Sequence, residues 1–249
     1  MSSVETATFP RMHAGRVLLE SARSLGGNAS AAIRLGWLAV AVSLATNVAY
    51  RTVLPEGFPW ALLSILIPLP FWLMLCVAWH RLLLKGPDSV QAPPLRLERT
   101  HGRYLLKLTL FIVVFTLLTV LAVLPMGAVD LSLRVATGAS GIAVWLVLTL
   151  LTPLLLKLPG EAVGRDLPKG AWQGRLANVP QAALVWLLFM ALAAALTVWR
   201  GSPVEGEALD LLGAVRLVPE VLLDYILLLV FLTLLSVVYR HLSEKSEPA

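Results

Sequence analysis

The sequence predicts an all-α polytopic membrane protein: a bundle of six transmembrane helices with short interfacial helices on the cytoplasmic side. The 249-residue chain is 58% hydrophobic and only 14% charged, with a mean hydropathy of +0.80. An average soluble domain carries about 25% charged residues, so this composition could hardly cover a water-facing surface. Six apolar stretches each reach about 20 residues, the length a helix needs to cross hydrocarbon. Basic residues concentrate in alternate gaps between these stretches.

Each stretch is apolar all round, whereas the core helices of soluble proteins usually keep a polar face. The six predicted spans are about Ala32 to Val53, Pro59 to Leu84, Tyr104 to Met126, Val135 to Leu158, Val179 to Trp199 and Leu217 to Tyr239. They define a cytoplasmic N-terminal segment (1–31), a membrane domain (32–240) and a cytoplasmic tail (241–249). The residues before the first span are mostly polar, so we expect this span to be an uncleaved anchor.

The distribution of basic residues predicts the orientation. On one side of the predicted membrane lie 16 of the 20 Lys and Arg residues: Arg11, Arg16, Arg23, Arg34, Arg81, Lys85, Arg96, Arg99, Arg103, Lys107, Lys157, Arg165, Lys169, Arg175, Arg240 and Lys245. The other side holds Arg51, Arg134, Arg200 and Arg216. Short loops rich in Lys and Arg stay cytoplasmic, so both termini are predicted to be cytoplasmic.

Several residues are predicted to lie at the cytoplasmic interface, where amphipathic rings and basic side chains meet the headgroups. They are Trp79, His80, Arg81, Tyr104, Trp172 and Tyr239. The segment from Pro10 to Leu25 mixes basic and apolar residues, as an interfacial amphipathic helix would. The loop from Glu161 to Gly174 could form a second surface-lying helix after Pro168.

The sixth span begins with an acidic face. Arg216, Glu220 and Asp224 recur every four residues, so a helix places them on one side over two turns. Asp224 lies about 12 Å beyond Arg216 along the helix axis, below the outer interface. In a functional interpretation Glu220 and Asp224 bind an ion, a proton or a cationic substrate from outside. In a structural one Arg216 pairs with Glu220, and an arginine from a neighbouring outer end pairs with Asp224; the shallow depth favours this second interpretation.

Two prolines interrupt the second span. Pro68 and Pro70 lie near its middle, where each removes a backbone hydrogen bond and is expected to kink the helix. Such breaks sometimes line transport sites, but prolines are common in membrane helices, so a plain kink is the favoured interpretation.

No residue pattern predicts a reaction. The four histidines and Cys76 form only isolated pairs, which fall short of the three or four ligands of a zinc site, and Cys76 is expected to be a small buried hydrophobe. No nucleophile, base and orienting group can be assembled from the sequence, and no phosphate-binding glycine motif is present. We therefore expect no catalytic residue, no metal and no cofactor.

Two stretches carry a family resemblance. Ala78-Trp79-His80-Arg81 with Arg103-Tyr104-Leu105, and Leu158-Pro159-Gly160-Glu161-Ala162-Val163-Gly164-Arg165 with Ala171-Trp172, resemble patterns of an uncharacterised family of proteobacterial six-span inner-membrane proteins. That family is distantly similar to the membrane domain of some glycerophosphoryl diester phosphodiesterases. The resemblance implies a six-helix bundle in a bacterial inner (plasma) membrane and implies no known reaction. Gly86-Pro87 departs from the acidic residue often found there.

The leading functional hypothesis is a non-enzymatic membrane protein that acts through lipid or partner-protein contacts. The alternative is a small transporter or channel with an outward-facing acidic site at Glu220 and Asp224. The expected partners are membrane lipids, with anionic headgroups on the cytoplasmic side, and a further copy of the chain or another membrane protein. Because the net charge of +5 follows from topology, we do not expect nucleic-acid binding.

Overall fold

A computed structural model describes residues 12–52, 58–91, 93–124, 133–165, 175–200 and 211–243, and all secondary structure in these ranges is helical. The α-helices are α1 (Ala14–Gly27), α2 (Ala29–Thr52), α3 (Phe58–Leu66), α4 (Leu69–Lys85), α5 (Arg99–Val123), α6 (Leu133–Leu155), α7 (Lys157–Val163), α8 (Arg175–Arg200) and α9 (Leu211–Ser243). A 3-10 turn, η1 (Pro87–Ser89), follows α4.

The prediction of an all-α bundle with six spans is confirmed. Within the described residues, six helical stretches are long and apolar enough to cross a membrane: Ala29–Tyr50, Leu62–Lys85, Arg99–Val123, Gly138–Val163, Asn178–Trp199 and Leu217–Ser243. Each coincides with one predicted span. The chain is therefore a multi-pass membrane protein in its architecture.

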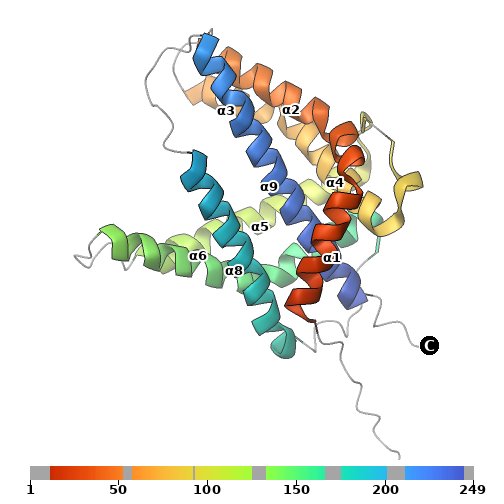
Figure 1. Cartoon of the computed structure of the whole chain (residues 1–249), viewed down its shortest axis with the longest axis vertical. Helices are drawn as coiled ribbons and strands as arrows, with labels where there is room; N and C mark the ends of the chain where they lie inside the picture. The colour runs from red at the N-terminus through yellow and green to blue at the C-terminus, as the bar shows by residue number, and fades with distance from the viewer. Residues whose placement is uncertain are drawn as a thin grey trace, which may run out of the picture.

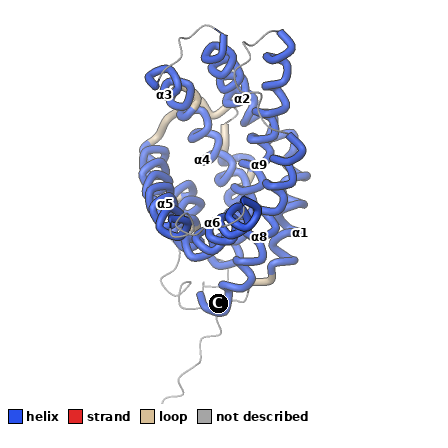
Figure 2. The backbone as a smooth tube through the Cα atoms, turned by 90° about the vertical axis from the view of Figure 1, so that its left-hand side faces the viewer, coloured by secondary structure: helices blue, strands red, loops and turns tan. Residues whose placement is uncertain are grey.

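The helices form two groups that differ in direction. α2, α4 and α9 pack on one another, and α9 is the most buried of the three. α5 and α6 form an antiparallel pair that runs across the direction of α9, and α8 packs on α6 (Figures 1 and 2). Most of the α5 surface is exposed outside the bundle, as is expected of a helix that faces lipid.

The second span consists of two helices. α3 ends at Leu66, and Pro68 stands at the N-cap of α4 with Pro70 in its first turn. The carbonyl of Pro68 accepts hydrogen bonds from the backbone N–H groups of Phe71 and Trp72, so the new helix begins with satisfied backbone groups. A proline fits this place because the first turn of a helix needs no N–H donor.

α1 is held against the bundle by side chains of α8. The backbone N–H groups of Met12 and Ala14 donate to Asn178 Oδ1 (2.8 Å) and Gln181 Oε1 (2.9 Å), which satisfies donors that a helix start leaves without partners. Val17 is fully buried, and α1 lies beside the last turns of α9 (Figure 1). The helix predicted from Pro10 to Leu25 therefore packs on protein along one face.

The fourth span ends in α7, which includes the beginning of the segment expected to lie on the membrane surface. α6 is followed by a turn at Leu156, and α7 then buries Leu158, Pro159, Gly160, Ala162 and Val163 between α4, α5 and α9. This part of the segment is therefore enclosed by neighbouring helices. Positions 166–174, where the surface helix after Pro168 is predicted, lie outside the described residues, and Trp172 is among them.

Close contact between α2 and α9 depends on one glycine. A methyl group at Gly36 would overlap the ring and the hydroxyl oxygen of Tyr225, whose O–H donates to the carbonyl of Ala32 at 2.5 Å. Because the two helices meet at this point, any larger residue would have to push them apart.

We expect Gly36→Ala to lower the free energy of unfolding by about 2 kcal/mol through overpacking. Gly141→Ala is the matched control, because nothing lies within 4 Å of its added methyl group. The free energy of unfolding of both variants can be measured in detergent micelles. Equal stability of the two variants would contradict the close packing at Gly36.

Candidate functional site

Within the described ranges, charged side chains from several helices form ion pairs at one end of the bundle, where α4 and α9 finish, α5 begins and α7 lies across them. We call this the basic end and define it by Arg81, Lys85, Arg103, Lys107 and Arg240. The two sequence patterns that carry the family resemblance meet here, although 81 positions separate Arg81 from Ala162.

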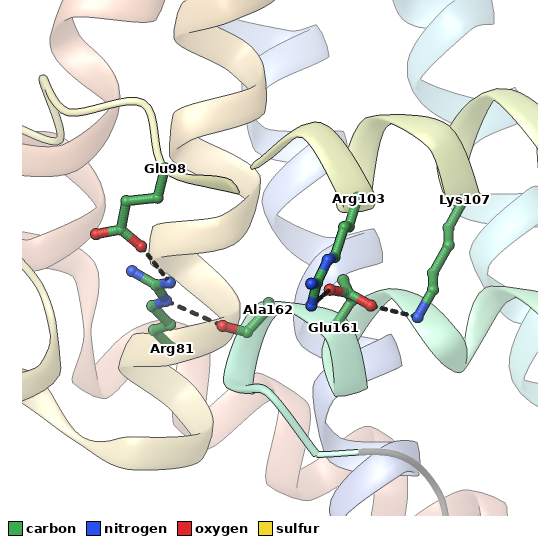
Figure 3. Close-up of polar contacts among 6 residues, drawn as sticks. All are labelled: Arg81, Glu98, Arg103, Lys107, Glu161 and Ala162. Atoms are coloured by element: carbon green, nitrogen blue, oxygen red, sulfur yellow. Dashed lines mark hydrogen bonds and ion pairs between the residues drawn. The ribbon is translucent and has the colours of Figure 1, made fainter. Parts of the chain in front are cut away.

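Arg81 connects three elements. Its Nε–H donates to the carbonyl oxygen of Ala162 in α7 at 2.9 Å, and its Nη2 donates to Glu98 Oε2 at 2.7 Å (Figure 3). Glu98 is the N-cap of α5 and forms a capping box with His101, whose Nδ1 accepts from the Glu98 backbone N–H at 2.9 Å. One guanidinium group therefore fixes α4 against α7 and against the start of α5.

Glu161 holds α5 against α7. Its carboxylate, whose side chain is 13% exposed, accepts a hydrogen bond from Lys107 and lies 3.9 Å from Arg103 Nη1 (Figure 3). One anion thus faces two cations of the same helix. The arrangement leaves this part of the basic end with a net positive charge.

The end of α7 is shaped by glycine. Gly164 adopts the left-handed conformation (φ +69°), and the N–H of Arg165 donates back to the carbonyl of Gly160 at 2.9 Å, as in many helix C-termini. A methyl group at Gly160 would stand 2.5 Å from the carbonyl oxygen of Arg165. That same oxygen accepts a hydrogen bond from the Tyr239 hydroxyl at 2.8 Å. The Pro-Gly-Glu-Ala-Val-Gly-Arg pattern is therefore explained by chain reversal and docking on α9.

Three rings predicted to lie in an aromatic belt are buried in protein. Trp79 is fully buried, and its Nε1–H donates to Thr233 Oγ1 of α9 at 2.9 Å. Tyr104 and Tyr239 are almost fully buried as well. Their depth in a membrane stays a prediction, but their surroundings are protein, because their polar atoms have partners on distant segments of the chain.

Ser236 and His80 form the contact closest to a nucleophile–base pair. His80 Nδ1 lies 2.7 Å from Ser236 Oγ, and His80 Nε2 lies 3.1 Å from the Tyr104 hydroxyl. The Ser236 hydroxyl donates to the Leu232 carbonyl (2.9 Å), so we assign the proton of the neutral imidazole to Nδ1 and the Tyr104 O–H as donor to Nε2. The sequence does not predict this pair, because 156 positions separate its members.

The geometry of this pair is that of a structural link. His80 is 0% and Ser236 1% exposed, and each polar atom in the chain from Tyr104 to Leu232 has a partner. A catalytic serine needs a substrate beside it and a hydroxyl proton directed at its base. Here the proton points to a helix carbonyl. Cys76 is also buried in this core, as expected of a small hydrophobe.

A second ionic cluster attaches α1 to α9. Glu20 lies 2.9 Å from Arg16 Nε, 3.1 Å from Arg240 Nη2 and 3.1 Å from His241 Nε2. Burial alone would raise the pKa of the Glu20 carboxyl, but the hydrogen bonds from the two arginines and the charge of His241 outweigh it, and the pKa lies below its ordinary value. The hydrogen bond from Arg81 lowers the pKa of Glu98 in the same way, against a smaller effect of burial.

The connection between α4 and α5 exposes apolar and basic side chains together. Leu95 is 65% and Leu97 is 60% exposed, and the neighbouring Arg96 and Arg99 are exposed as well. Leucines that stand out from a loop at the end of a membrane span, with arginines between them, are typical of segments that enter the headgroup region.

The predicted acidic site lies at the opposite end of α9. Asp224 is exposed and Glu220 is half-buried, and both take part in interactions within the structure. The side chain of Arg216 lies outside the described residues, as do those of Arg51, Arg134 and Arg200. The buried neighbours Val221 and Tyr225 occupy the face of α9 that packs on the bundle. In the described ranges, no group of three or more His, Cys, Asp or Glu side chains is placed to hold a metal ion.

Comparison with protein-family models, with curated proteins and with solved structures found no match to this chain.

Loss of the Glu161 carboxylate should cost stability, because Lys107 and Arg103 would lose their shared anion. We expect Glu161→Gln to lower the free energy of unfolding by about 2 kcal/mol. The side chain of Glu98 is 41% exposed. Solvent screens its ion pair, so Glu98→Gln should cost less than about 1 kcal/mol. The free energies of unfolding of Glu161→Gln and Glu98→Gln can be compared in detergent micelles. An equal loss of stability in the two variants would show that Glu161 does not hold α5.

Acid should weaken the basic end through Glu20 and Glu98. Because the folded-state pKa of each carboxyl is lowered from 4.5, its stabilisation is complete above that value and is lost as the pH falls through the lowered pKa. Melting temperatures between about pH 6 and pH 3 should fall more steeply for the wild type than for Glu20→Gln/Glu98→Gln. Parallel curves for the two proteins would contradict this assignment.

Proposed function

We propose that this chain is a non-enzymatic multi-pass protein of a bacterial inner membrane that acts through its contacts with lipids. The basic end faces the cytoplasm, and both termini lie on that side. Support for this orientation comes from the excess of basic residues at this end and from the rule that such loops are retained inside.

One observation carries the proposal: in the exposed segment from Leu95 to Leu97, Arg96 stands between two leucines at the end of two spans. The leucines favour the acyl boundary, and the arginine favours the phosphates of anionic lipids, contributing about 1 kcal/mol near such a surface. A membrane that presents anionic headgroups on this side matches both properties at once.

The polar interior supports a non-enzymatic role. Trp79, His80, Tyr104 and Ser236 are occupied in hydrogen bonds that join α4, α5 and α9, and each is almost fully buried. A catalytic group has to reach its substrate, and these four buried groups, as they are placed, do not. Here their arrangement serves the packing of spans in a medium without water.

Membership in the proteobacterial six-span family is part of this proposal. Its two sequence patterns supply Arg81, Tyr104 and Glu161, which lie together at the basic end. Shared residues that bring the same three helices together would be expected of relatives with the same bundle. The role of the family is proposed to be equally non-enzymatic.

Lipid analysis of the purified protein tests the proposal. After extraction in mild detergent, we expect anionic phospholipids to be enriched at least about threefold over their share in the source membrane, as one or two favourable arginine contacts would produce. If lipids copurify in the same proportions as in the source membrane, and a second protein copurifies in stoichiometric amount, the proposed lipid contacts would give way to contacts with a partner protein. A proton-dependent flux that Asp224→Asn abolishes would favour the transporter instead.

A further inference from the structure

A pocket of about 180 Å³ lies at the basic end, between α4, the connecting segment and the start of α5. Its apolar wall comes from α4 and includes Met74 and Ala78. Its polar residues include Arg81, Arg96 and His101, and the connecting segment covers one side. We propose that this pocket binds the phosphate headgroup of an anionic phospholipid, an inference that rests on the lipid-contact function proposed above.

The apolar and the polar wall are separated along the axis of α4. Met74 and Arg81 both line the pocket and stand two helical turns apart in α4. At the rise of an α-helix, the pocket therefore extends about 10 Å from the polar side chains toward the middle of the span. A free anion would gain nothing from the apolar wall. A phospholipid places its phosphate at the arginines and its glycerol and first acyl carbons against α4.

The charges in the pocket leave a place for an anion. Arg81 uses two of its five N–H groups on Ala162 and Glu98, and the ion pair with Glu98 cancels its charge. Arg96 is exposed and forms no ion pair within 4 Å with a carboxylate of the described residues, although its charge acts on Glu98 together with that of Arg81. With two arginines and one carboxylate in its lining, the pocket keeps a positive charge, which Arg96 supplies. Arg81 lines the same pocket.

The pocket is large enough for a lipid headgroup but too small for a whole lipid. Its volume of about 180 Å³ is well below the lower limit of about 300 Å³ for the pockets of drug-sized ligands. A phosphate with a few carbon atoms is within this size, and the acyl chains stay in the bilayer. The exposed Leu95 and Leu97 stand on both sides of Arg96 and bring it to the headgroup level.

A pair of neighbouring arginines gives the test a matched control. Arg96 lines the pocket, whereas Arg99 is exposed three positions later and does not line it. Native mass spectrometry of the full chain in detergent, titrated with short-chain phosphatidylglycerol or phosphatidylcholine, measures binding to the wild type, Arg96→Gln and Arg99→Gln. Equal melting temperatures establish that both variants are folded.

We expect the wild type to bind phosphatidylglycerol about five- to tenfold more tightly than phosphatidylcholine, Arg96→Gln to lose most of this preference, and Arg99→Gln to stay within about twofold of the wild type. Inorganic phosphate at the same concentration as the lipid should not displace it. Displacement by phosphate would mean a free-anion site and overturn the proposal. Loss of a copurifying protein, and not of lipid, from Arg96→Gln would also overturn it.

The results distinguish a failure of the pocket proposal from a failure of the proposed lipid-contact function. If anionic lipids copurify with the wild type while Arg96→Gln and Arg99→Gln show the same loss of bound anionic lipid, the result would support the lipid-contact function and contradict the pocket proposal. If the wild type shows no preference for the anionic lipid in either experiment, both fall.

Discussion

The two hydrogen bonds of the Arg81 guanidinium group determine how the basic end is assembled. Arg81 follows a long apolar stretch, so its charge has to be compensated close to where the span ends. The Ala162 carbonyl and the Glu98 carboxylate do this, and each belongs to a different part of the chain. Once α4, α7 and the start of α5 are joined, Glu161 faces Arg103 and Lys107, and Tyr239 can bond the chain reversal after α7.

The sequence predicts the fold class well because span length and apolar composition are local properties. It does not predict how the spans are arranged. Hydropathy gives a residue's depth along the helix but not the side on which its ring lies, so the sequence does not predict that Trp79 bonds Thr233, 154 positions away. Likewise, the buried environment of α7 depends on contacts with α4, α5 and α9 that leave no periodic pattern in Lys157–Val163.

The candidate site is predictable only in part. Arg81 stands out in the sequence for its place at the end of a span, and Glu98 with His101 has the three-residue spacing of a capping box. By contrast, Glu161 and Ser236 gain their partners from distant helices, so the residue spacing around them does not predict these contacts. Asp224 is the most conspicuous charge in the sequence, and both it and Glu220 take part in interactions, while Ser236, Tyr239 and Arg240 have their partners at the other end of α9.

The attachment of α1 has a consequence for the order of biosynthesis. α1 is synthesised before α8 and α9, but Met12 and Ala14 at its start bond Asn178 and Gln181, and Glu20 pairs with Arg240 and His241. Those partners emerge only with the fifth span and at the end of the sixth. α1 therefore cannot complete its docking until α8 and the last turns of α9 have been synthesised, so the contacts that hold it form only after most of the spans are in place.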